Sequence, residues 1–418
     1  MKLIVPLCAT ATGLCGLVPT TAWAADAQTH TQSDQDSAIE WLFQTRTRYQ
    51  TTQKDKLEDA ESLTHRTQAG FKLPLAQSGL TLLAEWENSI TILGDDRNTS
   101  EDPKPQFATI NDPEHSELNR LNLAYAATEN LSFKLGRQYI AFDNNRFVAS
   151  ANWRQDRGSH DALRIDVSNG PLQASYAYHW QINRPAGTNN DWRTDTHLFH
   201  ASYEASDQFK LTGFTYLIDI LDPLEGDRSN MTLGSRLTAN HKVNDDFKLY
   251  VDAMIANQTD YGSSSLDYDL NFFAGSLTAK FGDFKALIGY DYIEGNGTNS
   301  IQTPFAALKS FTGAANVINA GQRAAPPDGA KALTLGTGFT HDFDAGGIVE
   351  GIDVSVYYLD FEAENTGIDL GSEWDASIKL DLTNNFSMEL GYADYNSASG
   401  SSGLKDTSKT WFILSYKY

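Results

Sequence analysis

The sequence predicts an all-β protein, a transmembrane antiparallel β-barrel of about 18 strands, with about 16 as the alternative. Apolar residues alternate with polar ones at a period of two in many segments, as on the two faces of a strand. The connectors between these segments alternate between short and long. Apart from the N-terminal region, no apolar run reaches the roughly 18 residues that a spanning helix needs.

The composition narrows the class of protein further. The 418 residues carry a formal net charge of −22, so no basic surface is available for nucleic acid, and we expect no nucleic-acid partner. The two cysteines are Cys8 and Cys15, both within a predicted signal peptide. The exported chain is therefore expected to have no disulfide, no cysteine metal ligand and no thiol nucleophile.

Residues 1–24 are predicted to be a signal peptide. Lys2 provides the positive charge, an apolar stretch follows, and Ala22-Trp23-Ala24 fits an A-x-A cleavage site. Residues 25–38 are polar and acidic and are expected to form a flexible periplasmic segment. The barrel is expected to occupy residues 39–418.

The last strand of the chain has an aromatic and apolar face formed by Phe412, Leu414, Tyr416 and Tyr418. Such a strand is typical of the terminal signal that the outer-membrane barrel assembly machinery recognises. An edge strand of a soluble sandwich is the alternative, but its exposed aromatic edge would favour aggregation. The sequence thus predicts the bacterial outer membrane as the location, with its lipid and lipopolysaccharide as partners.

The connectors are expected to be short turns on the periplasmic side and long loops on the outer side. Segments expected to be strands are 39–50, 80–93, 118–127, 172–184, 231–241, 247–257, 284–293 and 331–341. Two segments break the alternation. Apolar residues lie on both faces of 208–221, and the apolar parity changes within 270–281, where we expect a bulge near Phe273.

A barrel of this size leaves a water-filled lumen. Strand parity turns several arginines away from the apolar face, and in lipid each would cost about 2 to 4 kcal/mol at the midplane. The lumen is therefore expected to hold Arg46, Arg48, Arg120, Arg164 and Arg236. The same parity sends carboxylates inward, namely Glu85, Glu87, Asp166, Asp252, Asp291, Glu373, Asp375, Asp381 and Glu389. These charges either pair with one another or contact a passing solute.

Two stretches resemble recurrent segments of a known family. Leu135-Gly136-Arg137-Gln138, Asp143-Asn144-Asn145-Arg146-Phe147-Val148, Asn152-Trp153-Arg154-Gln155 and His160-Asp161-Ala162 together resemble the central signature of the alginate export family. Residues 302–313 are similar to its other recurrent segment. The resemblance implies an arginine-lined conduit for an anionic polysaccharide, narrowed by inward loops. Within the matching motif, Arg137, Arg146 and Arg154 are the arginines that the resemblance places in the conduit.

We expect a bulge at Gly136 to turn Arg137 inward, because plain alternation would place it beside the outward Leu135. The candidates for a constriction loop are Asp143, Asn144, Trp153, Phe305 and Phe311. The loop at 294–330 is expected to fold inward because its phenylalanines would be unfavourable in water, although packing between outer loops would explain them equally well.

No catalytic or metal-binding pattern is predicted. His160-Asp161 would need a serine nucleophile nearby, and it lies within the family signature instead. His197 and His200 are three apart and fall on opposite strand faces, and Asp267-x-Asp269-x-Asn271 has Phe272 where a calcium loop needs glycine. We therefore predict no enzyme activity, no metal and no cofactor.

The leading hypothesis is a channel for diffusion of hydrophilic, anionic solutes such as acidic oligosaccharides or polysaccharides. A general porin without anion selectivity is one alternative. A plugged surface receptor or adhesion barrel, whose acidic loops bind the ligand, is the other.

Overall fold

The computed structural model describes residues 39–75, 78–187, 190–307, 309, 311–319, 325–343, 347–401 and 403–418. The predicted signal peptide and the segment 25–38 lie outside these residues.

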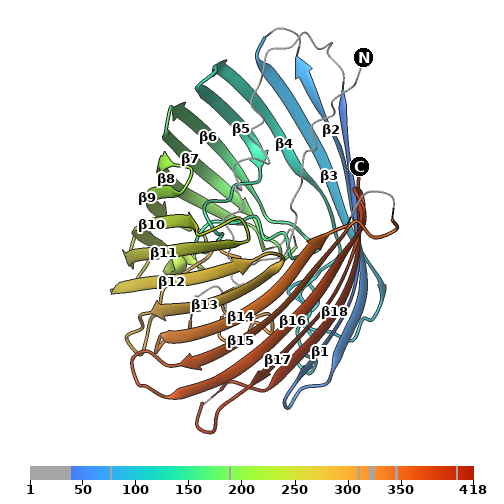
Figure 1. Cartoon of the computed structure of the whole chain (residues 1–418), viewed down its shortest axis with the longest axis vertical. Helices are drawn as coiled ribbons and strands as arrows, with labels where there is room; N and C mark the ends of the chain where they lie inside the picture. Colours follow the sequence, from blue (N-terminus) through green and yellow to red (C-terminus); the bar gives the residue numbers. More distant parts are fainter. Residues whose placement is uncertain are drawn as a thin grey trace.

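The described chain forms one sheet of 18 antiparallel strands, each hydrogen-bonded to its neighbours in sequence (Figure 1). The pairing of the first strand with the last closes the barrel, with Gln44 opposite Lys417 and Lys54 opposite Thr407. The strands are β1 Glu40–Lys54, β2 Ala60–Leu75, β3 Leu80–Leu93, β4 His115–Thr128, β5 Leu131–Gln138, β6 Ser159–Asn169, β7 Leu172–Asn183, β8 Trp192–Ser206, β9 Phe209–Ile218, β10 Asn230–Lys242, β11 Phe247–Asp260, β12 Asp269–Phe281, β13 Phe284–Ile293, β14 Ala330–Asp342, β15 Gly351–Glu362, β16 Asp369–Thr383, β17 Phe386–Asn396 and β18 Thr407–Lys417. The predicted fold class is confirmed, with 18 strands and not 16.

The connectors alternate in length as predicted, except that residues 343–350 at the short-turn side outnumber residues 363–368 at the long-loop side. Residues 282–283 join β12 to β13, whereas residues 294–329 join β13 to β14. A short 3-10 helix, η2 Gly226–Arg228, lies in the β9–β10 loop. Among the described residues, no helix is long and apolar enough to cross a membrane. The start of β1 and the end of β18 meet at the short-turn side, where the Tyr418 amide donates to the Phe43 carbonyl over 2.9 Å.

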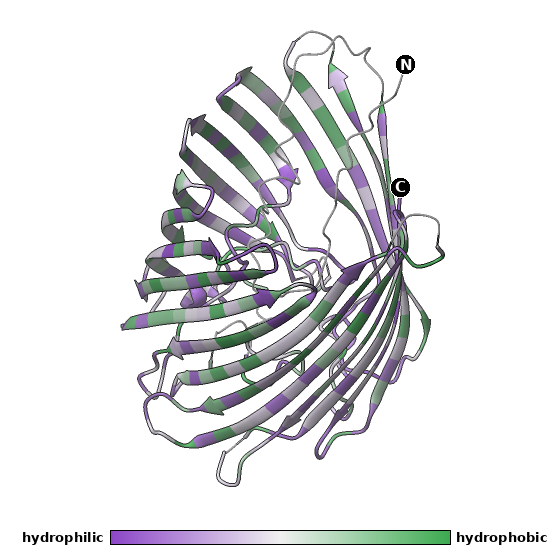
Figure 2. Ribbon diagram, in the orientation of Figure 1, coloured by the Kyte–Doolittle hydropathy of each residue, from purple (hydrophilic) through white to green (hydrophobic). Residues whose placement is uncertain are grey.

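The outer wall is apolar and the inner wall is polar. On β14, Leu333 and Leu335 are exposed on the outside, whereas the intervening Thr334 lines an interior cavity. Figure 2 shows the resulting alternation of hydrophobic and hydrophilic residues along the strands. This is the pattern of a barrel whose outer face contacts lipid.

The bulge expected near Phe273 is wrong. β12 pairs with β11 from Asp269 to Phe281 without a shift in register, and its pairing with β13 is equally regular. Leu270 and Phe272 face inward and are buried, whereas Phe273 faces outward. The apolar parity changes because this part of the inner wall is also apolar.

The same explanation applies to β9, the strand within 208–221. Phe214, Tyr216 and Ile218 are buried inside the barrel, and Phe209 and Leu211 are exposed outside it. Both faces are apolar because loop residues fill the lumen against the inner face.

The two faces of β14 provide a matched test of which side contacts lipid. Leu335→Arg should destabilise the barrel in lipid vesicles by about 2 to 4 kcal/mol, the cost of an arginine near the midplane. Thr334→Arg should be tolerated because its guanidinium reaches water in the lumen. Equilibrium unfolding in vesicles measures both changes, and equal destabilisation would contradict the assignment of faces.

Candidate functional site

The chain leaves the wall after β5 and crosses the lumen before β6. We call residues 139–158 the first inward loop. Phe142 stacks on His200 of β8, with 4.7 Å between ring centroids, and Phe147 packs against Phe214 of β9 and Phe272 of β12. Further along, Trp153 meets Trp411 of β18 edge to face at 5.4 Å. The loop therefore contacts strands on several sides of the barrel.

Two arginines of β1 hold the far end of this loop. Arg46 donates from Nη1 to the carbonyl of Asn152 over 2.7 Å and from Nε to Gln155 Oε1 over 2.9 Å. Arg48 donates to the carbonyl of Trp153 over 2.6 Å and forms an ion pair with Asp112, a residue of the β3–β4 loop. The guanidinium groups thus replace water as partners of carbonyls in a loop that crosses the lumen.

The middle of the loop is fixed by two carboxylate contacts. Arg146 forms an ion pair with Asp291 of β13 at 2.8 Å. Asp143 lies 3.1 Å from His200 Nε2 and 3.5 Å from Arg236 Nη1. Burial by itself would raise the pKa of Asp143, but the hydrogen bond with His200 and the charge of Arg236 outweigh it and hold the pKa below its ordinary value.

The described residues between β13 and β14 form a second inward loop that pairs with the first. The amide of Ala149 donates to the carbonyl of Phe305 over 2.7 Å. The amide of Ala307 donates to the carbonyl of Asn145 over 3.0 Å. The Arg146 guanidinium lies 3.8 Å from the ring centroid of Phe311. The prediction that this loop folds inward agrees with the burial of both phenylalanines among lumen residues.

Two carboxylates of β16 bind backbone amides of the second inward loop. The amide of Ala314 donates to Asp375 Oδ2 over 3.0 Å, and the amide of Ala315 donates to Glu373 Oε1 over 2.6 Å. Gly313 precedes them at φ +85°, and a Cβ there would lie 2.3 Å from Glu373 Oε2. Only glycine fits at this turn, which explains the glycine at the end of the motif.

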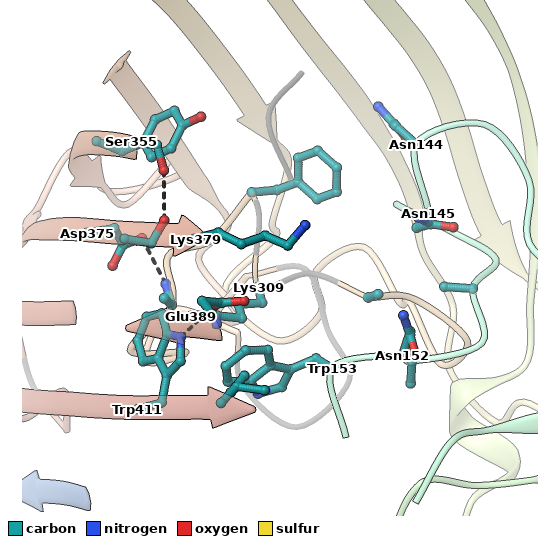
Figure 3. Close-up of a pocket in the computed structure, with 18 of the residues that line it drawn as sticks. Asn144, Asn145, Asn152, Trp153, Lys309, Ser355, Asp375, Lys379, Glu389 and Trp411 are labelled. Atoms are coloured by element: carbon teal, nitrogen blue, oxygen red, sulfur yellow. Dashed lines mark hydrogen bonds between the residues drawn. The ribbon is translucent and has the colours of Figure 1, made fainter. Parts of the chain in front are cut away.

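A cavity of about 690 Å³ lies between the inward loops and the short-turn end of the barrel. Asn144, Arg146, Trp153 and Phe311 line it from the loops. Thr383, Asn384 and Asn385 line it at the short turn between β16 and β17. Figure 3 shows Lys309, Trp153, Trp411 and Glu389 gathered on one side, and Asn144, Asn145 and Asn152 on the other.

Charges of both signs line this cavity, as the sequence predicted. Lys379 lies 2.7 Å from Asp381, and Trp411 Nε1 donates to Glu389 over 2.6 Å. The Lys309 ammonium lies 3.0 Å from the ring centroid of Trp153 and 3.8 Å from that of Trp411. A cation between two indole rings is stabilised by their electron-rich faces.

Arg120, Arg164 and Arg236 lie in the lumen wall with carboxylate partners. Arg120 forms a two-pronged pair with Glu85 at 2.9 and 2.6 Å. Arg164 lies 2.9 Å from Asp166, and Arg236 lies 2.5 Å from Asp252. Arg154 of the first inward loop donates to the carbonyl of Asn111 over 3.2 Å. Of the arginines proposed to contact solute, Arg46 and Arg146 line the described cavity.

The bulge expected at Gly136 is wrong. β5 pairs with β4 and β6 without a register shift there, which places Arg137 opposite Leu121 and Asp161. Gly136 instead takes φ +116° within the strand. Arg137 remains on the face of the exposed Leu135 and forms an ion pair with Asp161 at 2.8 Å.

Several residues that anchor the loops were not predicted from the sequence. Arg66 of β2 donates to the carbonyl of Arg154 over 3.3 Å, and Gln155 donates to Thr64 over 2.9 Å. Asp112, the ion-pair partner of Arg48, lies in the long loop between β3 and β4. Parity could have placed Arg66 inward, because it alternates with Leu63 and His65 as Arg48 does with Tyr49, but no sequence signal pairs Asp112 with Arg48.

The family of this chain follows from a family model that matches more than half of its residues. The alginate export family model matches residues 38–271. The chain belongs to the alginate export family. A search of curated protein sequences gives no match.

Solved structures of outer-membrane channels share the fold. OpdK of Pseudomonas aeruginosa, solved with vanillate, aligns with a TM-score of 0.70 at 12% identity, covering 91% of this chain and 98% of that one. OccAB2 of Acinetobacter baumannii gives 0.70 at 13% identity, with coverages of 91% and 98%. OpdL of P. aeruginosa gives 0.67 at 15% identity, again covering 91% and 98%. These neighbours are channels and not enzymes, and this family member is an outer-membrane barrel of the same fold.

Removing one anchor of the first inward loop should loosen the constriction. Arg48→Ala leaves Asp112 buried without its cation, a change that costs about 3 to 5 kcal/mol at comparable buried pairs. We expect larger and noisier single-channel currents than in the unchanged protein. Arg228→Ala, which removes a loop pair with Glu225 far from the constriction, serves as the control. Identical current traces for both variants would contradict the anchoring role.

Proposed function

We propose that this alginate export family member is a diffusion channel for hydrophilic anionic solutes, with acidic oligosaccharides or polysaccharides as the substrate class. The observation that carries the proposal is the group formed by Lys309, Trp153 and Trp411 at the cavity surface, with Arg46 nearby. Indole rings offer apolar faces to the C–H groups of a sugar, and the cations attract its carboxylates.

The family supports this substrate class, since its description is alginate export. The structurally similar OpdK was solved with vanillate, a small carboxylate. A narrow lumen also suits selection, because a solute that must pass the inward loops loses water and meets the lining charges directly. The partners of the lining arginines then set how strongly each one attracts an anion.

One observation favours the alternative of a plugged barrel. A continuous apolar cluster runs through the lumen and includes Phe142, Phe147, Phe305 and Phe311 together with wall residues of β9 and β12. Because such a cluster excludes water, the inward loops would close the conduit until they move. Conductance of the unchanged protein separates the two functions, since a channel passes ions with its loops in place, whereas a plugged barrel gains current only when residues 142–153 are removed.

Anion preference should depend on Lys309. In planar bilayers with a salt gradient, we expect Lys309→Met to lower the permeability ratio of chloride to potassium about two- to fivefold, the effect of one charge in a partly hydrated site. Methionine keeps the length of the side chain, so the volume of the cavity changes little. The reversal potential measures this ratio.

Lys242→Met is the matched control, because Lys242 pairs with Asp245 at an exposed short turn outside the cavity. A cation-preferring unchanged protein, or equal reversal potentials for both variants, would contradict the proposed selectivity. It would leave the general porin as the function.

A further inference from the structure

A second cluster of ionisable side chains lies away from the cavity, on the long-loop side of the lumen wall. Glu87 of β3, His115 and Glu117 of β4 and Asp156 of the first inward loop each place one ligand atom within 4.8 Å of the others. Glu87, His115 and Asp156 are buried. Three segments far apart in the sequence thus bring three carboxylates and one imidazole together.

The orientation of His115 suits a cation at the centre of the cluster. Its Nδ1 lies 3.5 Å from the carbonyl oxygen of Pro113, which would accept a hydrogen bond from a proton on Nδ1. Nε2 then points its lone pair at Glu87 Oε1, 3.1 Å away, and at Asp156 Oδ1, 3.9 Å away. Three acceptor atoms facing one another are unfavourable unless a proton or a metal ion lies among them.

Asp156 supplies a second observation that points to a bound cation. Its Oδ2 accepts a hydrogen bond from the amide of Gly187 over 2.8 Å. Its Oδ1, the atom aimed at His115, is buried and accepts no hydrogen bond from any residue that the structure describes. A buried carboxylate oxygen without a partner is costly, and a metal ion would satisfy it.

The arginines beside the cluster contact its glutamates but do not pair with Asp156 Oδ1. Arg66 Nε lies 3.9 Å from Glu87, and Arg137 Nη1 lies 3.7 Å from Glu117. Arg137 is already paired with Asp161. Arg157 donates its backbone amide to Glu87 over 2.9 Å, while its guanidinium lies over the ring of Tyr139 at 3.6 Å.

We propose that Glu87, His115, Glu117 and Asp156 bind one divalent transition-metal ion, of the class represented by Zn²⁺ and Mn²⁺. Imidazole nitrogen together with carboxylate oxygen is a donor set that these ions accept, whereas Ca²⁺ and Mg²⁺ prefer oxygen alone. The ion would join β3 and β4 to the returning end of the first inward loop. It would therefore pin the constriction close to the anchors on β1, because Asp156 directly follows Gln155, the partner of Arg46.

Metal binding is tested on the full barrel in detergent after removal of bound metal with a chelator. Equilibrium dialysis against micromolar Zn²⁺, read by elemental analysis, should give about one more ion per chain in the unchanged protein than in His115→Gln. X-ray absorption of the bound zinc should show imidazole scattering and nitrogen or oxygen ligands at about 2.0 to 2.1 Å.

His197→Gln is the matched control, because His197 also lies beside a carboxylate, with 3.7 Å between its Nε2 and Asp195 Oδ1, but outside the cluster. It should bind zinc as the unchanged protein does. Asp156→Asn is a second variant, since its amide oxygen still accepts from Gly187, and it should weaken binding at least tenfold. Heat-modifiable migration in gels verifies that each variant forms a barrel.

Equal zinc content in the unchanged protein and in both cluster variants would overturn the proposal, as would zinc without imidazole scattering. In that case a proton on His115 Nε2 accounts for the cluster. Because these readouts do not involve ion currents, they stand or fall independently of the proposed channel selectivity.

Discussion

The constriction of this barrel depends on how the Arg46 and Arg48 guanidiniums of β1 bind the backbone of the first inward loop. A loop that crosses a lumen brings carbonyl groups away from bulk water, and each unpaired one costs free energy. Planar guanidinium groups with several donors can satisfy neighbouring carbonyls together. The Asn152 and Trp153 carbonyls both accept hydrogen bonds from these arginines. The loop is therefore attached to β1 and not only to β5, the strand that precedes it.

The inward loops also explain why some strands are apolar on both faces. In an empty barrel, the inner face would contact water and would be polar. Here Phe214 of β9 and Phe272 of β12 pack on Phe147 of the first loop, so the inner face of these strands is a protein core. Burying a phenylalanine contributes about 1.5 to 3 kcal/mol, which offsets part of the entropy lost when the loops become ordered.

Charge pairing determines what the lumen can offer a solute. Most of the inward arginines are held by a carboxylate on a neighbouring strand, as Arg120 is by Glu85 and Arg236 by Asp252. Such pairs fix the width of the lumen and reduce the attraction of each arginine for a passing anion. Lys309 adds a cation that is held between two indole rings at the cavity surface.

The sequence left a barrel of 16 strands and packing of the 294–330 loop among the outer loops open as alternatives, but by itself it determined the barrel fold and the inward direction of Arg46, Arg48 and Arg120. These features follow from a period of two and from the cost of charge in lipid, which act on neighbouring residues. Only the tertiary structure decided that Arg48 pairs with Asp112, that Leu270 and Phe272 face a core, and that Gly136 forms no bulge. Each of these depends on segments far apart in the chain that meet inside the closed barrel, and alternation along one strand contains no information about them.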